Sequence, residues 1–235
     1  MARKVDVAPL PANALGMDAD CYVVIDVFRA TTTIATLFAR GLHSLIACAE
    51  IDDARRLAKE HDALLFGEVG GLRPEGFGYG NSPVEAMGAP VEGRTAVLFT
   101  TNGTLALVQC AGRGQVFAGA FVNAEAVAAA LAPHSSIVLV CAGNESGRVF
   151  ALEDFAGAGA IARRLVAADP ALAVGDAARA AIAVSPLVAA ESEHAARLRA
   201  IGLEADIAFA LSEDTFQAVP AVVEHAPGRM YLERR

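Results

Sequence analysis

The segment Tyr22-Val-Val-Ile-Asp-Val-Phe-Arg-Ala-Thr-Thr-Thr33 joins an apolar run of strand length to small polar residues that can open a helix. Two further runs have this form, Ala96-Val-Leu-Phe-Thr-Thr-Asn-Gly-Thr104 and Ile137-Val-Leu-Val-Cys-Ala-Gly-Asn144. A fourth, Ala63-Leu-Leu-Phe-Gly-Glu68, ends in an acidic residue before a glycine-rich loop. In open α/β sheets, ligands bind beyond the carboxyl ends of the strands, where helix N-termini favour an anion. The pattern therefore predicts a site for a small anionic molecule.

Apolar runs and helical patterns alternate as far as about residue 170, which is typical of an α/β fold. We expect a three-layer α/β/α arrangement with a largely parallel or mixed sheet, because the strands are apolar on both faces. Strands are predicted near residues 3–7, 22–27, 45–49, 63–67, 95–100, 115–118 and 137–141. Helices are predicted near residues 31–41, 52–61, 83–88, 103–111, 123–132 and 152–167.

The C-terminal third differs from the rest of the chain, because its Ala-rich segments carry Glu and Arg. We expect helices over 176–183, 189–201 and 203–211 and a last strand over 230–233. Gly202 is predicted to cap the second of these helices. No linker, repeat or low-complexity tract marks a boundary, so the sequence predicts one compact domain over residues 1–235, with two lobes as the alternative, and a helical C-terminal third.

The composition excludes several classes of protein. The chain has 19 Lys and Arg against 27 Asp and Glu, a net charge of −8, and lacks the basic stripe that nucleic-acid binding requires. Its apolar stretches are of strand length, and none follows the basic residues near Met1, so neither a membrane span nor a signal peptide is expected. The widely spaced Cys21, Cys48, Cys110 and Cys141 are expected to be buried and free, as in a cytoplasmic protein.

Asp26 interrupts the first apolar run, and Arg29 follows it closely. A buried charge is costly unless it is paired or functional, so two interpretations are open. The two residues form either a structural ion pair or a catalytic pair, in which the Arg binds an oxyanion beside the carboxylate. In the second case Thr31, Thr32 and Thr33 supply hydroxyl and N–H donors for the substrate at a helix start.

The segment Thr100-Thr-Asn-Gly-Thr104 repeats this arrangement after another apolar run. A left-handed turn followed by a helix cap explains these residues without a ligand. The alternative is that they bind a second anionic group of the same ligand. The candidate substrate-binding residues here are Thr101, Asn102, Gly103 and Thr104.

Residues 67–83 form the longest expected loop, and their glycines indicate a lid that closes on a ligand. The loop matches neither the P-loop nor the dinucleotide-binding glycine pattern. Glu68, at its start, is either a metal ligand or an exposed carboxylate. Asn81 and Ser82, at its end, are candidate substrate-binding residues.

Glu153 and Asp154 open the predicted helix over 152–167. The helix dipole alone favours acidic residues in a first turn. The alternative is a pair of oxygen ligands for Mg²⁺, an ion that prefers carboxylates, water and substrate phosphate. The candidate metal ligands are therefore Asp26, Glu68, Glu153 and Asp154.

Two standard phosphatase mechanisms do not fit the chain. In cysteine phosphatases an Arg follows the nucleophilic Cys at a fixed spacing, which after Cys141 falls on Gly147 and not on Arg148. Haloacid-dehalogenase phosphatases need a second carboxylate where this chain has Phe28. None of the five histidines is close in sequence to the strand-end residues, so we expect them to be solvated or to cap helices.

Five blocks, in order, resemble the 2-phosphosulfolactate phosphatase family. They are Ile25-Asp-Val-Phe-Arg-Ala-Thr-Thr-Thr33, Gly76-Phe-Gly-Tyr-Gly-Asn-Ser-Pro83, Thr100-Thr-Asn-Gly-Thr104, Cys141-Ala-Gly143 and Leu152-Glu-Asp154. The stretch from Gly202 to Pro220 extends the resemblance over nearly the whole chain. The chain departs from the family at Gly78, where an Asp is common.

The resemblance implies a three-layer α/β fold, a homodimer, and Mg²⁺-dependent hydrolysis of (2R)-2-phospho-3-sulfolactate to 3-sulfolactate and phosphate. For the mechanism we favour metal-assisted attack by water, with Asp26 as metal ligand or base and Arg29 stabilising the developing charge. A covalent intermediate on Asp26 is the competing mechanism. Two other functions are open: a phosphatase of another small phospho-acid, and a non-catalytic protein that binds phosphorylated or sulfonated acids.

Overall fold

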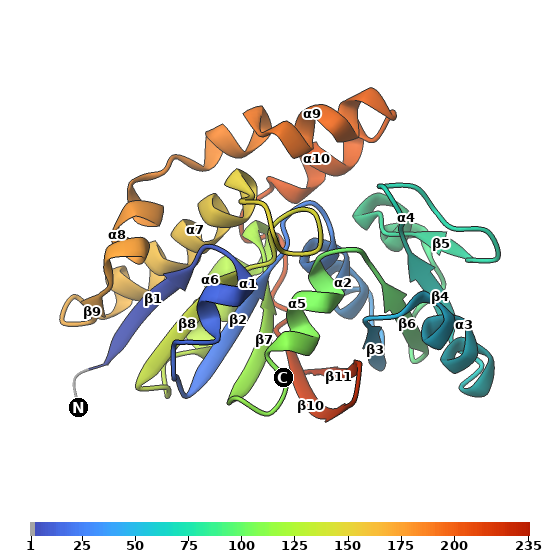
Figure 1. Ribbon diagram of the computed structural model, residues 1–235, viewed down its shortest axis with the longest axis horizontal. Helices are drawn as coiled ribbons and strands as arrows, with labels where there is room; N and C mark the ends of the chain where they lie inside the picture. The colour runs from blue at the N-terminus through green and yellow to red at the C-terminus, as the bar shows by residue number, and fades with distance from the viewer. Residues whose placement is uncertain (1–2) are drawn as a thin grey trace.

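The computed structural model of the protein describes residues 3–235, and Met1 and Ala2 lie outside the described residues. One mixed sheet contains 11 strands in the order β5-β4-β6-β3-β11-β10-β7-β2-β8-β1-β9 (Figure 1). The strands are β1 (Lys4–Ala8), β2 (Cys21–Ile25), β3 (Ser44–Cys48), β4 (Leu64–Gly67), β5 (Tyr79–Gly80), β6 (Thr95–Phe99), β7 (Gln115–Gly119), β8 (Ser136–Cys141), β9 (Ala173–Val174), β10 (Pro220–Ala226) and β11 (Arg229–Arg234).

The sheet consists of two parallel segments joined by the C-terminal hairpin. All strand pairs within β5-β4-β6-β3 and within β7-β2-β8-β1-β9 are parallel. Between the segments, β11 pairs antiparallel with β3, and β10 pairs antiparallel with β7 at Ala221 and Phe117. The last two strands of the chain therefore complete the middle of the sheet.

Helices cover both faces of the sheet and follow most of its strands. They are α1 (Pro11–Ala14), α2 (Ala30–Ala39), α3 (Ile51–Glu60), α4 (Pro83–Gly88), α5 (Gly103–Gln109), α6 (Ala124–Ala130), α7 (Leu152–Ala168), α8 (Asp176–Ala183), α9 (Glu193–Ala200) and α10 (Glu204–Ala210), with the 3-10 turns η1 (Phe121–Asn123) and η2 (Pro186–Glu191). In Figure 1, α9 and α10 arch above the middle of the sheet.

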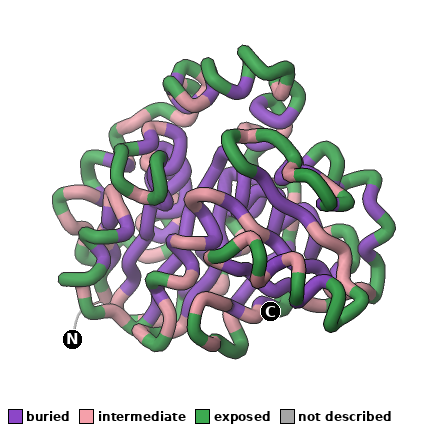
Figure 2. The backbone as a smooth tube through the Cα atoms, turned by 45° about the vertical axis from the view of Figure 1, so that its right-hand side comes forward, coloured by how far each residue is buried: buried purple, intermediate pink, exposed green. Residues whose placement is uncertain are grey.

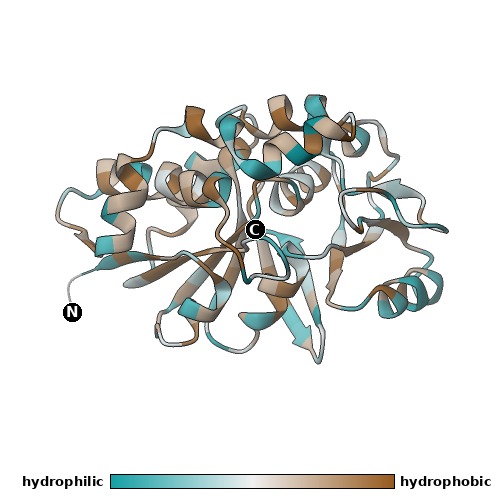
Figure 3. Ribbon diagram, turned by 45° about the horizontal axis from the view of Figure 1, so that its top comes forward, coloured by the Kyte–Doolittle hydropathy of each residue, from teal (hydrophilic) through white to brown (hydrophobic). Residues whose placement is uncertain are grey.

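Two large hydrophobic cores lie on opposite faces of the sheet. Along β2, Val23 and Ile25 pack into the core beneath α6, α7 and α8, whereas Tyr22 and Val24 pack into the core beneath α1, α2 and α5. Because successive side chains of a strand point to opposite faces, a strand apolar throughout needs cover on both sides. The strands of the two parallel segments are accordingly mostly buried in Figure 2 and mostly apolar in Figure 3. The predicted three-layer α/β/α fold is confirmed.

The predicted elements are largely confirmed, and the main error concerns the C-terminus. Each strand and helix expected before residue 170 is present within a few residues of its expected ends. In the C-terminal third the expected helices and last strand are present, with the 3-10 turn η2 at the start of the second helix, but β10, which forms a hairpin with the last strand, was not expected. Gly202 has a φ of +80° just after α9, as a C-cap requires.

The four cysteines are buried and free, as expected. Within the part of the chain that the structure describes, no helix is long and apolar enough to cross a membrane.

The hairpin that joins the two segments is expected to be essential for stability. Leu232, fully buried on β11, packs into the core beneath α2 and α5. We expect Leu232→Ala to lower the free energy of unfolding by about 2–5 kcal/mol, because it leaves a cavity at the middle of the sheet. Urea titration measures the change. Val223→Ala, at an exposed position of the same hairpin, is the matched control and should change stability by about 0.5 kcal/mol or less. Equal losses in both variants would contradict this view.

Candidate active site

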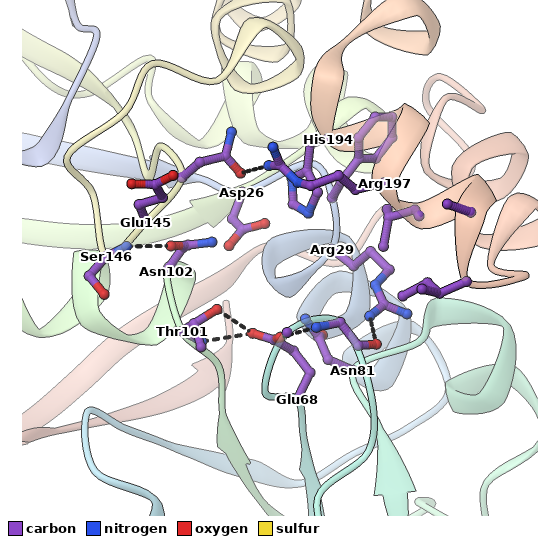
Figure 4. Close-up of a pocket in the computed structure, with 17 residues that line it drawn as sticks. Asp26, Arg29, Glu68, Asn81, Thr101, Asn102, Glu145, Ser146, His194 and Arg197 are labelled. Carbon is purple, nitrogen blue, oxygen red and sulfur yellow. Dashed lines mark hydrogen bonds between the residues drawn. The ribbon is translucent and has the colours of Figure 1, made fainter.

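The ends of four strands meet at one pocket of about 620 Å³ (Figure 4). Asp26 follows β2, Glu68 follows β4, Thr101 lies just after β6, and Asn144 lies just after β8. Residues of α9 line the pocket from the other side. The site predicted beyond the carboxyl ends of the strands is therefore present as a cavity.

The carboxylate of Asp26 points into the pocket although its residue is only 5% exposed (Figure 4). Its Oδ1 accepts the N–H of Ala30 at 3.2 Å, and no donor within residues 3–235 reaches its Oδ2. Burial raises the pKa of Asp26 to about 6. The charge of His194 and the N–H of Ala30 lower this pKa, whereas the carboxylates of Glu68 and Glu153 raise it.

Gly103 allows α5 to begin directly against Asp26. A Cβ at position 103 would lie 2.6 Å from Asp26 Oδ2 and 2.5 Å from the Cβ of Ala30. Any side chain there would displace the carboxylate. Gly103 was predicted to bind substrate, but it does not line the pocket, and its geometry explains it as a spacer.

Arg29 lines the pocket and is paired, but its partner is not Asp26. Its guanidinium binds Asp206 of α10 at 2.7 Å, and both side chains are almost fully buried. A second N–H of Arg29 donates to the carbonyl oxygen of Gly71 at 2.6 Å. Two of the five N–H groups are thus used, and three are left for a ligand. The structural Asp26–Arg29 ion pair, one of the two open interpretations, is therefore wrong, because an acidic residue distant in sequence takes this place.

Glu68 links the glycine-rich loop to the turn after β6 through hydrogen bonds of its carboxylate. Its Oε1 accepts the N–H and the hydroxyl of Thr101, each at 2.7 Å, and its Oε2 accepts the N–H of Gly71 at 2.8 Å. The expectation of an exposed loop carboxylate is wrong, since Glu68 is 6% exposed. The glycine-rich loop forms one side of the pocket and contains the short strand β5.

Asn81 has the environment of a ligand-binding residue. It lines the pocket and is only 3% exposed, yet its buried Oδ1 has no hydrogen-bond partner among residues 3–235. An unpaired buried amide oxygen is costly unless a ligand or water completes it. Gly78 of the same loop is exposed and does not line the pocket, so the departure from the family at this position lies outside the cavity wall.

Several predicted substrate donors are used within the protein instead. The hydroxyls of Thr31 and Thr32 donate to the carbonyl oxygens of Asp26 and Val27, and both threonines are fully buried with Thr33 at the start of α2. The hydroxyls of Thr104 and Ser82 also bind within the protein. The Thr104 hydroxyl donates to the carbonyl oxygen of Thr100, and the Ser82 hydroxyl donates to Asp206. Of the predicted substrate-binding residues, the pocket is lined by Asn81, Thr101 and Asn102.

Asp154 and Glu153 lie behind the pocket. Asp154 accepts the N–H of Val27 at 2.8 Å and of Gly143 at 3.0 Å, which ties the ends of β2 and β8 to α7. Burial, with the nearby carboxylates of Asp26 and Glu153, raises the pKa of Asp154. Neither Glu153 nor Asp154 is among the residues that line the cavity, so their role as metal ligands stays a prediction.

His194 and Arg197 of α9 line the pocket and were missed by the sequence analysis. His194 Nδ1 lies 2.8 Å from Glu153 Oε1, which leaves Nε2 as the free ring nitrogen. Arg197 donates to Asn144 Oδ1 at 3.0 Å. The expectation that His194 is solvated or a cap is wrong. The spacing of His194, Arg197 and Leu198 on one helix face is a signal, but any amphipathic helix shares it.

The donor set permits a divalent cation without a dedicated cage. Among residues 3–235 no group of three His, Cys, Asp or Glu side chains is placed to hold a metal ion. Mg²⁺ needs only one or two carboxylates when water and substrate phosphate complete its shell. Asp26, with an oxygen free of protein donors, fits this requirement, and Glu68 lines the same pocket.

Cys141 offers no alternative nucleophile. It is fully buried, and burial together with the carboxylates of Asp154 and Glu153 raises the pKa of its thiol well above the ordinary value. A thiolate is the nucleophilic form, so this environment opposes catalysis by Cys141.

The raised pKa of Asp26 predicts a pH-dependent cost in stability. Between its ordinary value of 3.8 and about 6, the folded protein binds more protons than the unfolded chain, so stability falls as the pH rises through this range. We expect Asp26→Asn to remove the loss and to stabilise the protein at pH 8 by on the order of 1–3 kcal/mol, with little gain at pH 4. Urea titration at both pH values, in EDTA, measures the difference. The exposed Asp18→Asn is the control, and an equal gain at both pH values would refute the prediction.

Comparison with known proteins assigns the chain to a family. The family model described as 2-phosphosulpholactate phosphatase matches residues 10–225. A protein of Thermotoga maritima named probable 2-phosphosulfolactate phosphatase is 40% identical over 226 residues, which cover 93% of this chain and 95% of the relative. A protein of the same name from Deinococcus radiodurans is 42% identical over 214 residues, covering 87% and 88%. With this match over nearly its whole length, the chain belongs to the 2-phosphosulfolactate phosphatase family.

Proposed function

We propose that this protein is a Mg²⁺-dependent phosphatase that hydrolyses (2R)-2-phospho-3-sulfolactate to 3-sulfolactate and phosphate. Membership of the family, whose relatives carry the name of this activity, supports the proposal. The observation that carries it is the carboxylate of Asp26, which ends a buried strand with one oxygen free and faces a pocket that contains two guanidinium groups.

The phosphoryl group is placed beside Asp26 and Arg29. Asp26 orients the attacking water and takes its proton as the oxygen bonds to phosphorus. The free N–H groups of Arg29 bind phosphoryl oxygens, and the amide of Asn81 supplies a further polar contact. Mg²⁺, held by Asp26 with Glu68 as the second candidate ligand, would neutralise charge on the phosphoryl oxygens.

His194 is placed to assist the leaving group. An alkyl alkoxide leaves poorly from phosphorus unless it is protonated as the ester bond breaks. Glu153 Oε1 lies 2.8 Å from Nδ1 of His194, which fixes the ring and leaves Nε2 to face the pocket. His194 then donates a proton from Nε2 to the ester oxygen, and Glu153 acts through it as a positioning residue.

We also propose that the enzyme is a cytoplasmic homodimer. The family resemblance supports the dimer, and the four buried free cysteines support a reducing compartment. Light scattering measures the mass in solution, and a monomer at micromolar concentration would overturn the dimer.

The first test is phosphate release from phosphosulfolactate with Mg²⁺ and with EDTA. We expect release that requires the metal and that falls by roughly 10³-fold in Asp26→Ala, with Asp18→Ala as the control. Absence of release with retained binding of the substrate would favour the non-catalytic binding protein. Faster hydrolysis of phospholactate or phosphoglycerate than of phosphosulfolactate would favour a phosphatase of another phospho-acid.

A chiral phosphoryl group separates the two mechanisms. Direct attack by water inverts the configuration at phosphorus, whereas a covalent intermediate on Asp26 involves two displacements and retains it. We expect inversion.

The role of His194 predicts a dependence on the leaving group. We expect His194→Asn to lower kcat for phosphosulfolactate by about 10²-fold, because general acid catalysis contributes on this scale. For a nitrophenyl phosphate, whose leaving group needs no proton, kcat should fall much less in the same variant. Glu153→Gln should lower kcat for phosphosulfolactate less than His194→Asn does and shift its pH dependence. Equal losses for both esters in His194→Asn would show that His194 only supports the fold.

A further inference from the structure

On one side of the pocket, next to the exposed Glu145, three side chains have only hydrogen-bond donors left free. They are Asn102, Asn144 and Arg197, and we call them the amide–guanidinium wall. The Oδ1 of Asn102 accepts the N–H of Ser146 at 2.9 Å, and the Oδ1 of Asn144 accepts from Arg197 at 3.0 Å. Both amide acceptors on this wall are therefore used inside the protein.

These contacts also fix which way the two amides point. The oxygen and nitrogen of an Asn side chain are distinguished by their partners, and a backbone N–H or a guanidinium can only face the oxygen. The amide nitrogens of Asn102 and Asn144 consequently point elsewhere, and no acceptor within residues 3–235 hydrogen-bonds to either. Arg197 uses one of its five N–H groups on Asn144.

The charge of Arg197 is also free. Arg29, the other guanidinium of the pocket, is neutralised by the buried carboxylate of Asp206 at 2.7 Å. In the part of the chain that the structure describes, Arg197 has no acidic partner within ion-pair distance. The two arginines therefore differ: Arg29 sits in a fixed, compensated pair, and Arg197 brings an uncompensated positive charge.

We propose that the amide–guanidinium wall is the receptor for the acid group carried on the carbon chain of the substrate, a sulfonate or a carboxylate. Such a group has oxygen acceptors and no donors, which complements a wall whose own acceptors are used. Arg197 provides the charge, and Asn102 and Asn144 fix the orientation. This inference rests on the proposed function and assigns the discrimination between acidic and neutral phosphate esters to Arg197.

Glu145 provides a test of opposite sign. It lines the mouth of the same pocket on the loop that carries Asn144 and Ser146, and it is exposed (Figure 4). A carboxylate there repels an incoming anion. If the wall binds an acid group, removing the charge of Glu145 strengthens binding and removing that of Arg197 weakens it.

The experiment compares kcat/KM for four esters in Arg197→Gln and wild type. Phosphosulfolactate carries both acid groups, 2-phospholactate a carboxylate, 2-phosphooxyethanesulfonate a sulfonate, and propan-2-yl phosphate neither. We expect Arg197→Gln to reduce the preference for acid-bearing over neutral esters by roughly 10- to 100-fold. Of the two esters with a single acid group, the one whose kcat/KM falls more in Arg197→Gln carries the group that the wall binds.

Two variants serve as controls. Arg199→Gln removes the same charge from the same helix at a position outside the pocket lining and should leave the preference unchanged. Glu145→Gln should increase the preference. The proposal is overturned if Arg197→Gln lowers kcat/KM equally for all four esters or for none of them. It is also overturned if Arg199→Gln changes the preference as much as Arg197→Gln does.

Product binding keeps the inference separate from the proposed activity. If wild type releases no phosphate from any of the esters, the proposed function fails, and calorimetry with 3-sulfolactate decides the inference alone. Weaker binding by Arg197→Gln than by wild type and Arg199→Gln supports the receptor. Equal binding by all three, or no binding to wild type, overturns it.

Discussion

The buried ion pair between Arg29 and Asp206 holds the pocket together. Asp206 belongs to α10, and its second oxygen accepts the hydroxyl of Ser82, while Arg29 also binds the carbonyl oxygen of Gly71. One pair thus joins the turn after β2, the glycine-rich loop, the start of α4 and the C-terminal helices. Burying two charges costs desolvation energy comparable to the gain from their attraction, so the pair adds little to net stability. Its clear effect is on position, because removing either partner leaves an unpaired buried charge.

A cluster of acidic side chains lies at and behind the pocket and would favour a bound cation. Besides burial, the carboxylates of Glu68 and Glu153 raise the pKa of Asp26, and those of Asp26 and Glu153 raise the pKa of Asp154; the charge of His194 lowers the pKa of Asp26. Because these pKa values are raised in the folded protein, ionisation of Asp26 and Asp154 lowers its stability at neutral pH. Binding of a divalent cation lowers that cost in stability. This cost does not displace Asp154, because the backbone N–H groups of Val27 and Gly143 hold its carboxylate in place.

The sequence predicted the strand ends well and the side-chain partners poorly. Asp26, Arg29 and Glu68 were located because apolar runs end at them, and a parallel sheet brings such ends together. The hydroxyls of Thr31 and Thr32 bind the backbone, which the sequence could not show, because a hydroxyl at a helix start serves a ligand or its own backbone equally well by pattern. The hairpin strand β10 was missed for a similar reason. Its polar segment Glu224-His225 resembles a surface loop by pattern, but in the structure it pairs with Tyr231 and Met230 of β11.

His194 and Arg197 show where local inference stops. They lie more than 160 residues beyond Asp26 along the chain, on a helix whose pattern is that of any surface helix, and only the packing of α9 over the strand ends brings them to the site. The pocket therefore has two origins. The strand-end turns supply Asp26 and Arg29, the groups proposed to act at phosphorus; the sheet positions Asp26, and Asp206 of α10 holds the guanidinium of Arg29. The C-terminal helix α9 supplies His194, proposed to protonate the leaving oxygen, and Arg197, proposed to bind the acid group on the carbon chain of the substrate. Changes in that helix can alter the choice of substrate without disturbing the sheet that positions Asp26.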